Sequence, residues 1–211
     1  MDMIAEIIGG MAGILLLILL FNGIAILGSI ALYVLQSLGL YQIAQRRAIR
    51  HSWMSWVPVL NTWILGSLSD QYNYVVHRKF RCARKWLLGL DIGICVTYLV
   101  TMILGLVGMA GLLTQMTQIT SPEELMKLAI AQPMYLASLV GSIIYWVVAI
   151  AGIVVNFVCL HNLYASCQPK NKTVYTVFSI LFPVTIPIFV FICRNKDQGM
   201  PPRRESVPEA L

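Results

Sequence analysis

Long runs of apolar residues, almost free of charge, alternate with short polar segments along this chain. Three of these runs, at about 11–40, 86–116 and 134–165, exceed the roughly 20 residues that an α-helix needs to cross the hydrocarbon core of a bilayer. Water cannot solvate such stretches, whereas lipid can. The pattern predicts an all-α fold: a polytopic helical membrane protein with three or four transmembrane helices plus Pro-broken re-entrant or interfacial helices.

A shorter apolar segment, 52–70, is interrupted by proline and lies between two basic clusters. If it crossed the membrane, one cluster would be carried to the far side, which the positive-inside rule disfavours. Tryptophan prefers the headgroup level, where its ring is buried and its N–H stays in contact with water. We therefore interpret this segment as an interfacial or re-entrant broken helix. The residues that define it are Trp53, Trp56, Pro58, Asn61 and Trp63.

The last apolar segment, 173–193, is just long enough to span a membrane, but Pro183 and Pro187 interrupt it. Like 52–70, it follows a long helix that ends in a Leu-Tyr pair and a basic link. If it is re-entrant, the chain has three spans, with the N-terminus outside and the C-terminus inside. If it spans, there are four, and the basic residues from Arg194 onward lie outside. The sequence leaves both topologies open.

The remaining segments carry weaker signals. Residues 117–133 predict a loop with a short surface helix to about residue 131, because Ser121, Pro122 and Glu124 form a helix start. We expect 1–198 to form a single membrane domain and the Pro-rich stretch 199–211 to be a disordered tail. Two G-x-x-x-G motifs, which allow helices to approach closely, are formed by Gly9 and Gly13 and by Gly89 and Gly93.

Basic residues are confined to particular segments and so indicate an orientation. Of the 15 Lys and Arg residues, only Lys127 lies outside two groups, one in 46–85 and one after residue 169. Because Lys and Arg are retained in the cytoplasm, we expect segment 41–85 to be cytoplasmic and the N-terminus to lie outside the cell membrane. The net charge of +6 fits anionic lipid headgroups better than nucleic acid. The expected headgroup contacts are Arg46, Arg47, Arg50, Arg78, Lys79, Arg81, Arg84 and Lys85.

The composition agrees with a chain embedded in lipid. Charged residues make up 11% of the 211 residues, against about a quarter in soluble domains. We expect this length to hold one membrane domain and no additional soluble catalytic domain. We also expect no secretory signal, because the first charges, Asp2 and Glu6, are acidic and the apolar run after them is too long for a cleavable segment.

Four polar residues inside or near the apolar runs are the candidates for chemistry: Asp91, Asn22, Asn156 and His161. An intramembrane acid is costly, which makes Asp91 a functional candidate, although its place near a helix start favours a structural pairing with Arg84 or Lys85. We expect His161 to cap a polar helix end, with a proton relay as the alternative. For the asparagines we expect interhelical hydrogen bonds, and the alternative is a polar lining for a substrate path.

Cysteine spacing and motif content argue against catalysis. The five Cys residues form no C-x-x-C pair, so we expect buried or reduced thiols and no metal site. The chain has no H-E-x-x-H, G-x-S-x-G, Walker or G-x-G-x-x-G motif, and no second carboxylate joins Asp91 in an apolar run. We therefore expect no enzyme activity and no cofactor.

One segment carries a resemblance to other proteins. Trp53 and Trp56, followed by Pro58, Asn61 and Gly66, resemble a segment of small uncharacterised bacterial multi-pass membrane proteins, in which a Trp–Pro–Asn stretch follows the first helix. The resemblance covers a minor part of the chain. It implies no activity.

These observations predict a non-enzymatic role, as an interaction or assembly factor that packs with partner helices or with itself. The small size, the G-x-x-x-G motifs and the missing catalytic motifs support this role. The alternative is a subunit of a small oligomeric transporter or channel, because broken helices in corresponding halves mark binding sites in transporters. The expected partners are a bilayer with anionic headgroups and a protein partner or second copy, but no nucleic acid.

Overall fold

The computed structural model of the chain describes residues 2–79, 82–115 and 132–201, and within these ranges all regular structure is helical. Three long helices dominate: α1 (Asp2–Arg46), α3 (Ala83–Gln115) and α5 (Pro133–Cys167). The shorter helices are η1 (Ser52–Trp56), α2 (Pro58–His77), α6 (Lys172–Leu181) and α7 (Thr185–Cys193). The all-α prediction is confirmed.

The three long helices are each long and apolar enough to cross a membrane. The apolar stretches are Leu16–Arg46, Ala83–Gly111 and Pro133–Cys167, and the most apolar 18-residue window in each has a mean hydropathy of 2.3, 2.2 and 2.5, respectively. They coincide with the three spans predicted from the sequence. The protein is therefore a polytopic, all-helical membrane protein.

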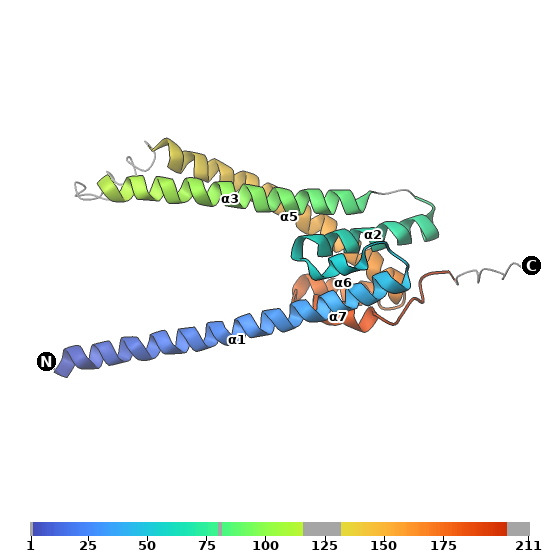
Figure 1. The fold of residues 1–211 in the computed structure, drawn as a ribbon, viewed down its shortest axis with the longest axis horizontal. Coiled ribbons are helices and arrows are strands. Elements are labelled where there is room, and N and C mark those ends of the chain that lie inside the picture. The colour runs from blue at the N-terminus through green and yellow to red at the C-terminus, as the bar shows by residue number, and fades with distance from the viewer. Residues whose placement is uncertain (1, 80–81, 116–131, 202–211) are drawn as a thin grey trace, which may run out of the picture.

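The shorter helices gather at one end of the long helices and form a compact unit with a buried core (Figure 1). We call this unit the head; it comprises η1, α2, α6 and α7 with the last turns of α1 and α5 and the first turns of α3. Its core consists of Leu40, Ile43, Ala44, Ile64, Leu65, Leu68, Leu87, Cys159, Leu160, Leu163, Tyr164, Cys167, Val190 and Cys193. The N-terminus lies at the far end of α1, away from the head.

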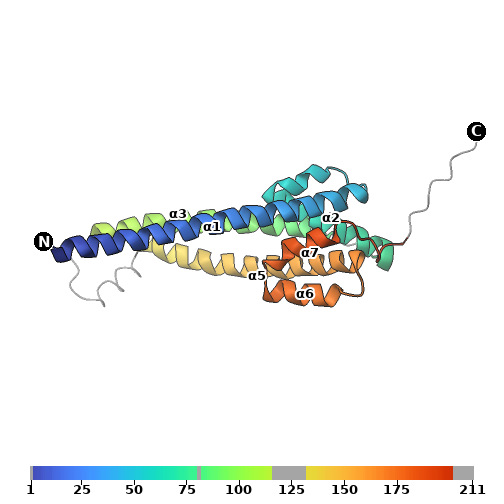
Figure 2. The same cartoon turned by 90° about the horizontal axis from the view of Figure 1, so that it is seen from below.

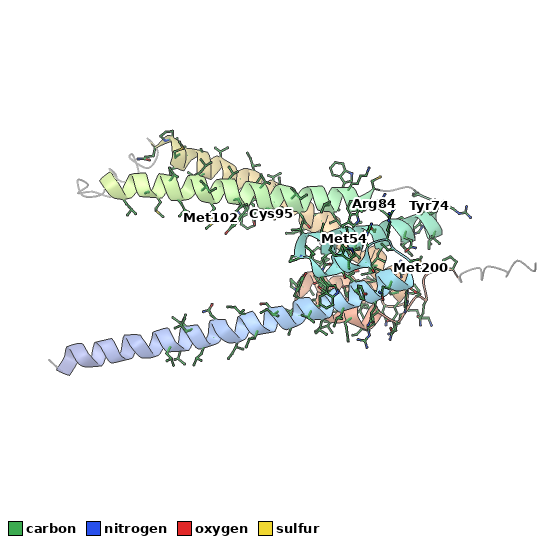
Figure 3. The ribbon with its side chains drawn as sticks, in the orientation of Figure 1. Met54, Tyr74, Arg84, Cys95, Met102 and Met200 are labelled. Atoms are coloured by element: carbon green, nitrogen blue, oxygen red, sulfur yellow. The ribbon has the colours of Figure 1, made fainter. Side chains whose placement is uncertain are left out.

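Beyond the head the long helices form two arms that extend in the same direction (Figures 1 and 2). One arm is α1 alone, and the other is the antiparallel pair of α3 and α5. Glycines bring the pair together: a Cβ added to Gly108 would lie 3.0 Å from the backbone N of Tyr135, and one added to Gly141 would lie 2.8 Å from Oγ1 of Thr101. Figure 3 labels Cys95 and Met102 along this part of α3.

Prolines determine where the shorter helices begin and end. Pro58 is the first residue of α2, and Val57 before it is extended (φ −98°, ψ 123°) because the proline ring disfavours a helical residue there. Phe182 before Pro183 is likewise not helical (φ −131°, ψ 86°), so α6 ends and α7 begins anew. The two helices have 10 and 9 residues, or about 15 and 14 Å. Segment 173–193 therefore does not form one continuous spanning helix.

Each Pro-broken segment packs against the long helix of the other half of the chain. Helix α7, which follows α5, packs against α1, whereas α2, which follows α1, packs against α5. At the first contact, a Cβ added to Gly39 would lie 3.0 Å from the backbone N of Phe191. The two halves of the chain, which have similar sequence patterns, are joined by these contacts into a single core.

Several boundaries differ from the sequence expectation. Helix α2 continues past residue 70 to His77 and ends where Arg78 adopts a left-handed conformation (φ 57°). Gly199, which we placed in the tail, is held in the head, because its N–H donates to the carbonyl oxygen of Ser166 at 3.0 Å. The expected surface helix up to residue 131 and the tail from residue 202 lie outside the described residues.

Candidate functional site

An ion-pair cluster fastens the end of α1 to the chain that follows α7. Oδ1 of Asp197 accepts hydrogen bonds from Nε and Nη2 of Arg47 at 3.0 and 2.7 Å, and Oδ2 pairs with Arg46. Nη2 of Arg47 also donates to Oγ of Ser166 at 2.9 Å. The Arg47 side chain is only 2% exposed. The expectation that Arg47 contacts lipid headgroups is therefore wrong, because an internal carboxylate holds it in the head.

Polar residues near the end of α5 link this helix to α6 and α2. Nδ1 of His161 lies 3.0 Å from Oγ1 of Thr176 in α6, so His161 joins two helices rather than capping a helix end. The next residue, Asn162, donates from Nδ2 to Oγ of Ser69 in α2 at 2.9 Å. These bonds satisfy polar groups inside the head and fasten α2 and α6 to α5.

Two of the four intramembrane candidates come together. Asp91 and Asn156 line one cavity of about 460 Å³ between α3, α5 and α6, beside Pro183. The expected pairing of Asp91 with Arg84 or Lys85 is not formed, because both ion pairs within the described ranges use Asp197. The structure thus separates the candidates, since neither Asn22 nor His161 lines this cavity.

The third candidate, Asn22, lies on the exposed arm of α1. Its Nδ2 donates to the carbonyl oxygen of Ile18 at 2.8 Å, within the same helix. At about 100° per residue, Asn22, Ser29, Tyr33 and Leu40 fall within about 40° of one another around the helix axis. Leu40 is fully buried in the head, and the hydroxyl of Tyr33 donates to the carbonyl oxygen of Trp56 at 2.6 Å.

The face of α1 that is buried in the head thus continues along the exposed arm. There it carries Asn22 and Ser29, both exposed, and ends at the head with Tyr33. We call these three residues the α1 stripe. Sequence analysis found Asn22 but missed the stripe, because only the buried position of Leu40 shows which face of the helix is the packing face.

The glycines expected to pack helices are not the ones that do so within the chain. A Cβ added to Gly13 or Gly89 meets nothing within 4 Å, and at Gly93 it makes an ordinary contact of 3.6 Å. Gly9 lies in the first turns of α1, where the structure does not describe side-chain surroundings. Among the helical glycines that the structure describes, the tightest approach is instead at Gly66, where a Cβ would lie 2.5 Å from Cα of Arg84.

The remaining headgroup candidates lie on the surface of the head. Arg50, Arg78, Lys79, Arg84 and Lys85 are exposed, and Arg81 lies outside the described residues. In the interfacial segment, Trp53 and Trp56 are 55% and 42% exposed, whereas Asn61 is buried. Exposed tryptophan and arginine at one end of the spans are typical of a protein surface in contact with lipid headgroups.

A second cavity, of about 670 Å³, opens among these basic residues. It lies between the link that follows α1, one side of α2 and the start of α3, and Arg50, His51 and Arg84 line it. The guanidinium carbon of Arg84 is 5.4 Å from the centre of the Trp63 ring, a cation–π contact. We call this space the basic cavity.

All five thiols are free, and three of them, Cys159, Cys167 and Cys193, are buried in the head. A hydrogen bond to Cys167 and burial raise the pKa of the Cys193 thiol, so this group is neutral near pH 7. Its place in the core and its neutrality argue against a reactive nucleophile at this position.

No protein-family model, curated protein or solved structure matches this chain. The resemblance of the Trp–Pro–Asn segment to small bacterial membrane proteins therefore stays a prediction.

Proposed function

We propose that the protein is a non-enzymatic membrane interaction or assembly factor, which binds a transmembrane helix of a partner or of a second copy along the α1 stripe. The observation that carries this proposal is the continuity of the stripe with the buried face of α1. In the head that face packs against the rest of the chain. On the arm the same face is exposed and carries polar groups.

The bilayer makes this exposure costly. None of the most apolar 18-residue window of α1 is buried within the described structure. The bond from Asn22 to Ile18 occupies one of the two N–H groups of the amide, and hydrocarbon offers no partner for its carbonyl oxygen. An apposed helix supplies such partners, and the small side chain of Ser29 lets a second backbone come close.

The proposed orientation places the head on the cytoplasmic side. The Lys and Arg residues, Lys127 excepted, belong to the head end of the spans or to the segments that follow it, and such residues resist translocation. In this arrangement η1 and α2 lie at the interface and α6 and α7 form a re-entrant pair. Labelling of the exposed Cys82 by a membrane-impermeant maleimide tests this orientation, with Cys82→Ser as the control. Labelling of Cys82 in intact cells, without permeabilisation, contradicts the orientation.

The interaction is tested by truncating the stripe and the opposite face in parallel. We expect native electrophoresis of mild detergent extracts to show the wild-type chain in a complex. Asn22→Ala should weaken the complex roughly fivefold, because an interhelical hydrogen bond is lost. Ile24→Ala, on the opposite face of α1, should leave it intact. A wild-type chain that migrates as a monomer, or equal effects of both variants, contradicts the proposal.

A subunit of a small oligomeric transporter or channel is the second candidate. The cavity that brings Asp91 and Asn156 together beside the Pro183 break supports it, because broken helices next to polar groups form binding sites in transporters. Liposomes that contain the protein should then show proton or cation flux that Asp91→Asn reduces. Flux no greater than in empty liposomes excludes this candidate.

A further inference from the structure

We propose that the basic cavity is a binding site for a phosphate group, with Arg50 and Arg84 as its cationic contacts. The proposal is independent of the role of the α1 stripe. It concerns a different surface, on the head rather than on the arm.

The charges around the cavity favour an anion. Three arginines, Arg47, Arg50 and Arg84, line it together with a single carboxylate, Asp70. That carboxylate is already engaged, because it accepts hydrogen bonds from the backbone N–H groups of Ala83 and Arg84 at 2.9 and 3.2 Å and so caps the start of α3. The guanidinium of Arg50 has no acidic partner within the described ranges.

Arg47 adds positive charge to one wall of the cavity. Its Nε and Nη2 are engaged by Asp197 and Ser166, and its buried Nη1 has no partner within the described structure. Asp197 is shared between Arg46 and Arg47. One carboxylate therefore faces two guanidinium groups, and the excess positive charge at this wall favours an anion in the cavity.

The walls of the cavity are held in place. The ring of Trp63 lies against the guanidinium of Arg84, and the Asp70 cap fixes the backbone from which that side chain extends. In the link after α1, Ala48 and His51 adopt left-handed conformations (φ 53° and 64°), which residues with a side chain rarely do. At Ala48 this conformation ends α1, where the N–H of Ile49 donates to the carbonyl oxygen of Ala44 at 2.9 Å and so fixes the start of the link.

The position of the cavity suits a phosphate carried by a lipid. It lies where the apolar stretch of α1 ends at Arg46 and that of α3 begins at Ala83, which is the level of the headgroups if these helices span. Its volume of about 670 Å³ lies within the usual range for sites that bind small molecules. A soluble phosphate compound offers the same anionic group, so the test separates the two sources.

The test measures ligand-dependent thermal stabilisation of the purified full chain in a neutral detergent. The probes are dihexanoyl phosphatidylglycerol, dihexanoyl phosphatidylcholine and inorganic phosphate, each titrated separately. We expect phosphatidylglycerol or inorganic phosphate to raise the unfolding temperature in a saturable way. Stabilisation by phosphatidylglycerol alone identifies a lipid ligand, whereas equal stabilisation by inorganic phosphate identifies a soluble one.

Matched variants separate a built site from general attraction to positive charge. Arg50→Gln should weaken the apparent affinity about tenfold, because one charged hydrogen-bond donor is lost. Arg84→Gln should do the same and Arg84→Lys should restore part of the loss. Lys170→Gln, an exposed charge of the head that does not line the cavity, should have no effect. Arg50 is exposed, so its variant should fold normally.

Two results would overturn the proposal. One is the absence of saturable stabilisation by both phosphatidylglycerol and inorganic phosphate. The other is an equal loss of affinity in Arg50→Gln and Lys170→Gln, which would show that the ligand responds only to the overall charge of the head.

Discussion

The arm of α1 and the α3–α5 pair have nearly the same hydropathy, yet they are packed in different ways. Along α3, the contact residues Ile94, Thr101 and Gly108 recur every seven residues and meet Gly152, Gly141 and Tyr135 of α5. This spacing keeps one face of each helix against the other. The arm of α1 carries its own stripe of polar and small residues, but no helix among the described residues covers it.

The difference teaches that hydropathy identifies a spanning helix but not its neighbour. In lipid, apolar side chains gain little by touching one another rather than lipid, so close packing and polar contacts decide which helices associate. The α3–α5 pair finds both within the chain. We infer that α1 finds them in another chain, and the following substitutions test the contrast between the two arms.

The largest effect is expected within α1 itself, where its head portion and its arm can be compared directly. Leu40→Ala removes a fully buried side chain from the head core and should lower the free energy of unfolding by about 2–5 kcal/mol. Leu17→Ala, at a site that is 66% exposed, should change it by less than about 0.5 kcal/mol. Denaturant titration in detergent measures both. Similar costs would mean that the arm packs within the chain.

A smaller effect is expected from adding bulk to the two arms. Gly141→Leu should drive α3 and α5 apart and destabilise the pair by about 1–3 kcal/mol, because a Cβ would lie 2.8 Å from Oγ1 of Thr101. Gly28→Leu is the control, since a Cβ there meets nothing within 4 Å and lies away from the α1 stripe. Thermal unfolding in detergent gives the comparison. A destabilising Gly28→Leu would show that α1 has an internal neighbour.

The smallest effect concerns the point where α1 leaves the head. Tyr33→Phe removes the hydrogen bond to the carbonyl oxygen of Trp56 and should cost about 0.5–1.5 kcal/mol. The same variant should increase hydrogen exchange in residues 52–56 and not in α5. Unchanged exchange in residues 52–56 would show that this bond does not fasten α1 to η1.

Much of the fold could be predicted from local sequence. The three long helices follow from apolar runs, and the breaks before Pro58 and Pro183 follow from the geometry of proline. The environments of the candidate site residues were harder to predict from the sequence. Arg47 was expected at the lipid surface but is buried against Asp197, 150 residues later in the chain. No local sequence pattern predicts a contact between residues so far apart in the chain.

The pairing expected for Asp91 fails for the same reason. A helix start near Arg84 and Lys85 suggested a local ion pair, but the guanidinium of Arg84 lies over Trp63 of α2, and Asp91 shares a cavity with Asn156 of α5. The glycines show the same limit of local patterns. Gly89 belongs to a G-x-x-x-G motif, yet a Cβ added to it would meet nothing within 4 Å. Gly66 and Gly141 belong to no G-x-x-x-G motif, yet both lie in tight helix contacts.

The sequence by itself determined which segments are helical, which of them can cross a bilayer and at which end the positive charge gathers. These properties depend on hydropathy, proline and charge within a few turns of chain. Only the tertiary structure decided that α7 packs on α1 and α2 on α5, that Arg47 is withdrawn from the surface, and which face of α1 is left for a partner. Each of these depends on the fit between surfaces that are distant in the chain, which the apolar character of a helix does not specify by itself.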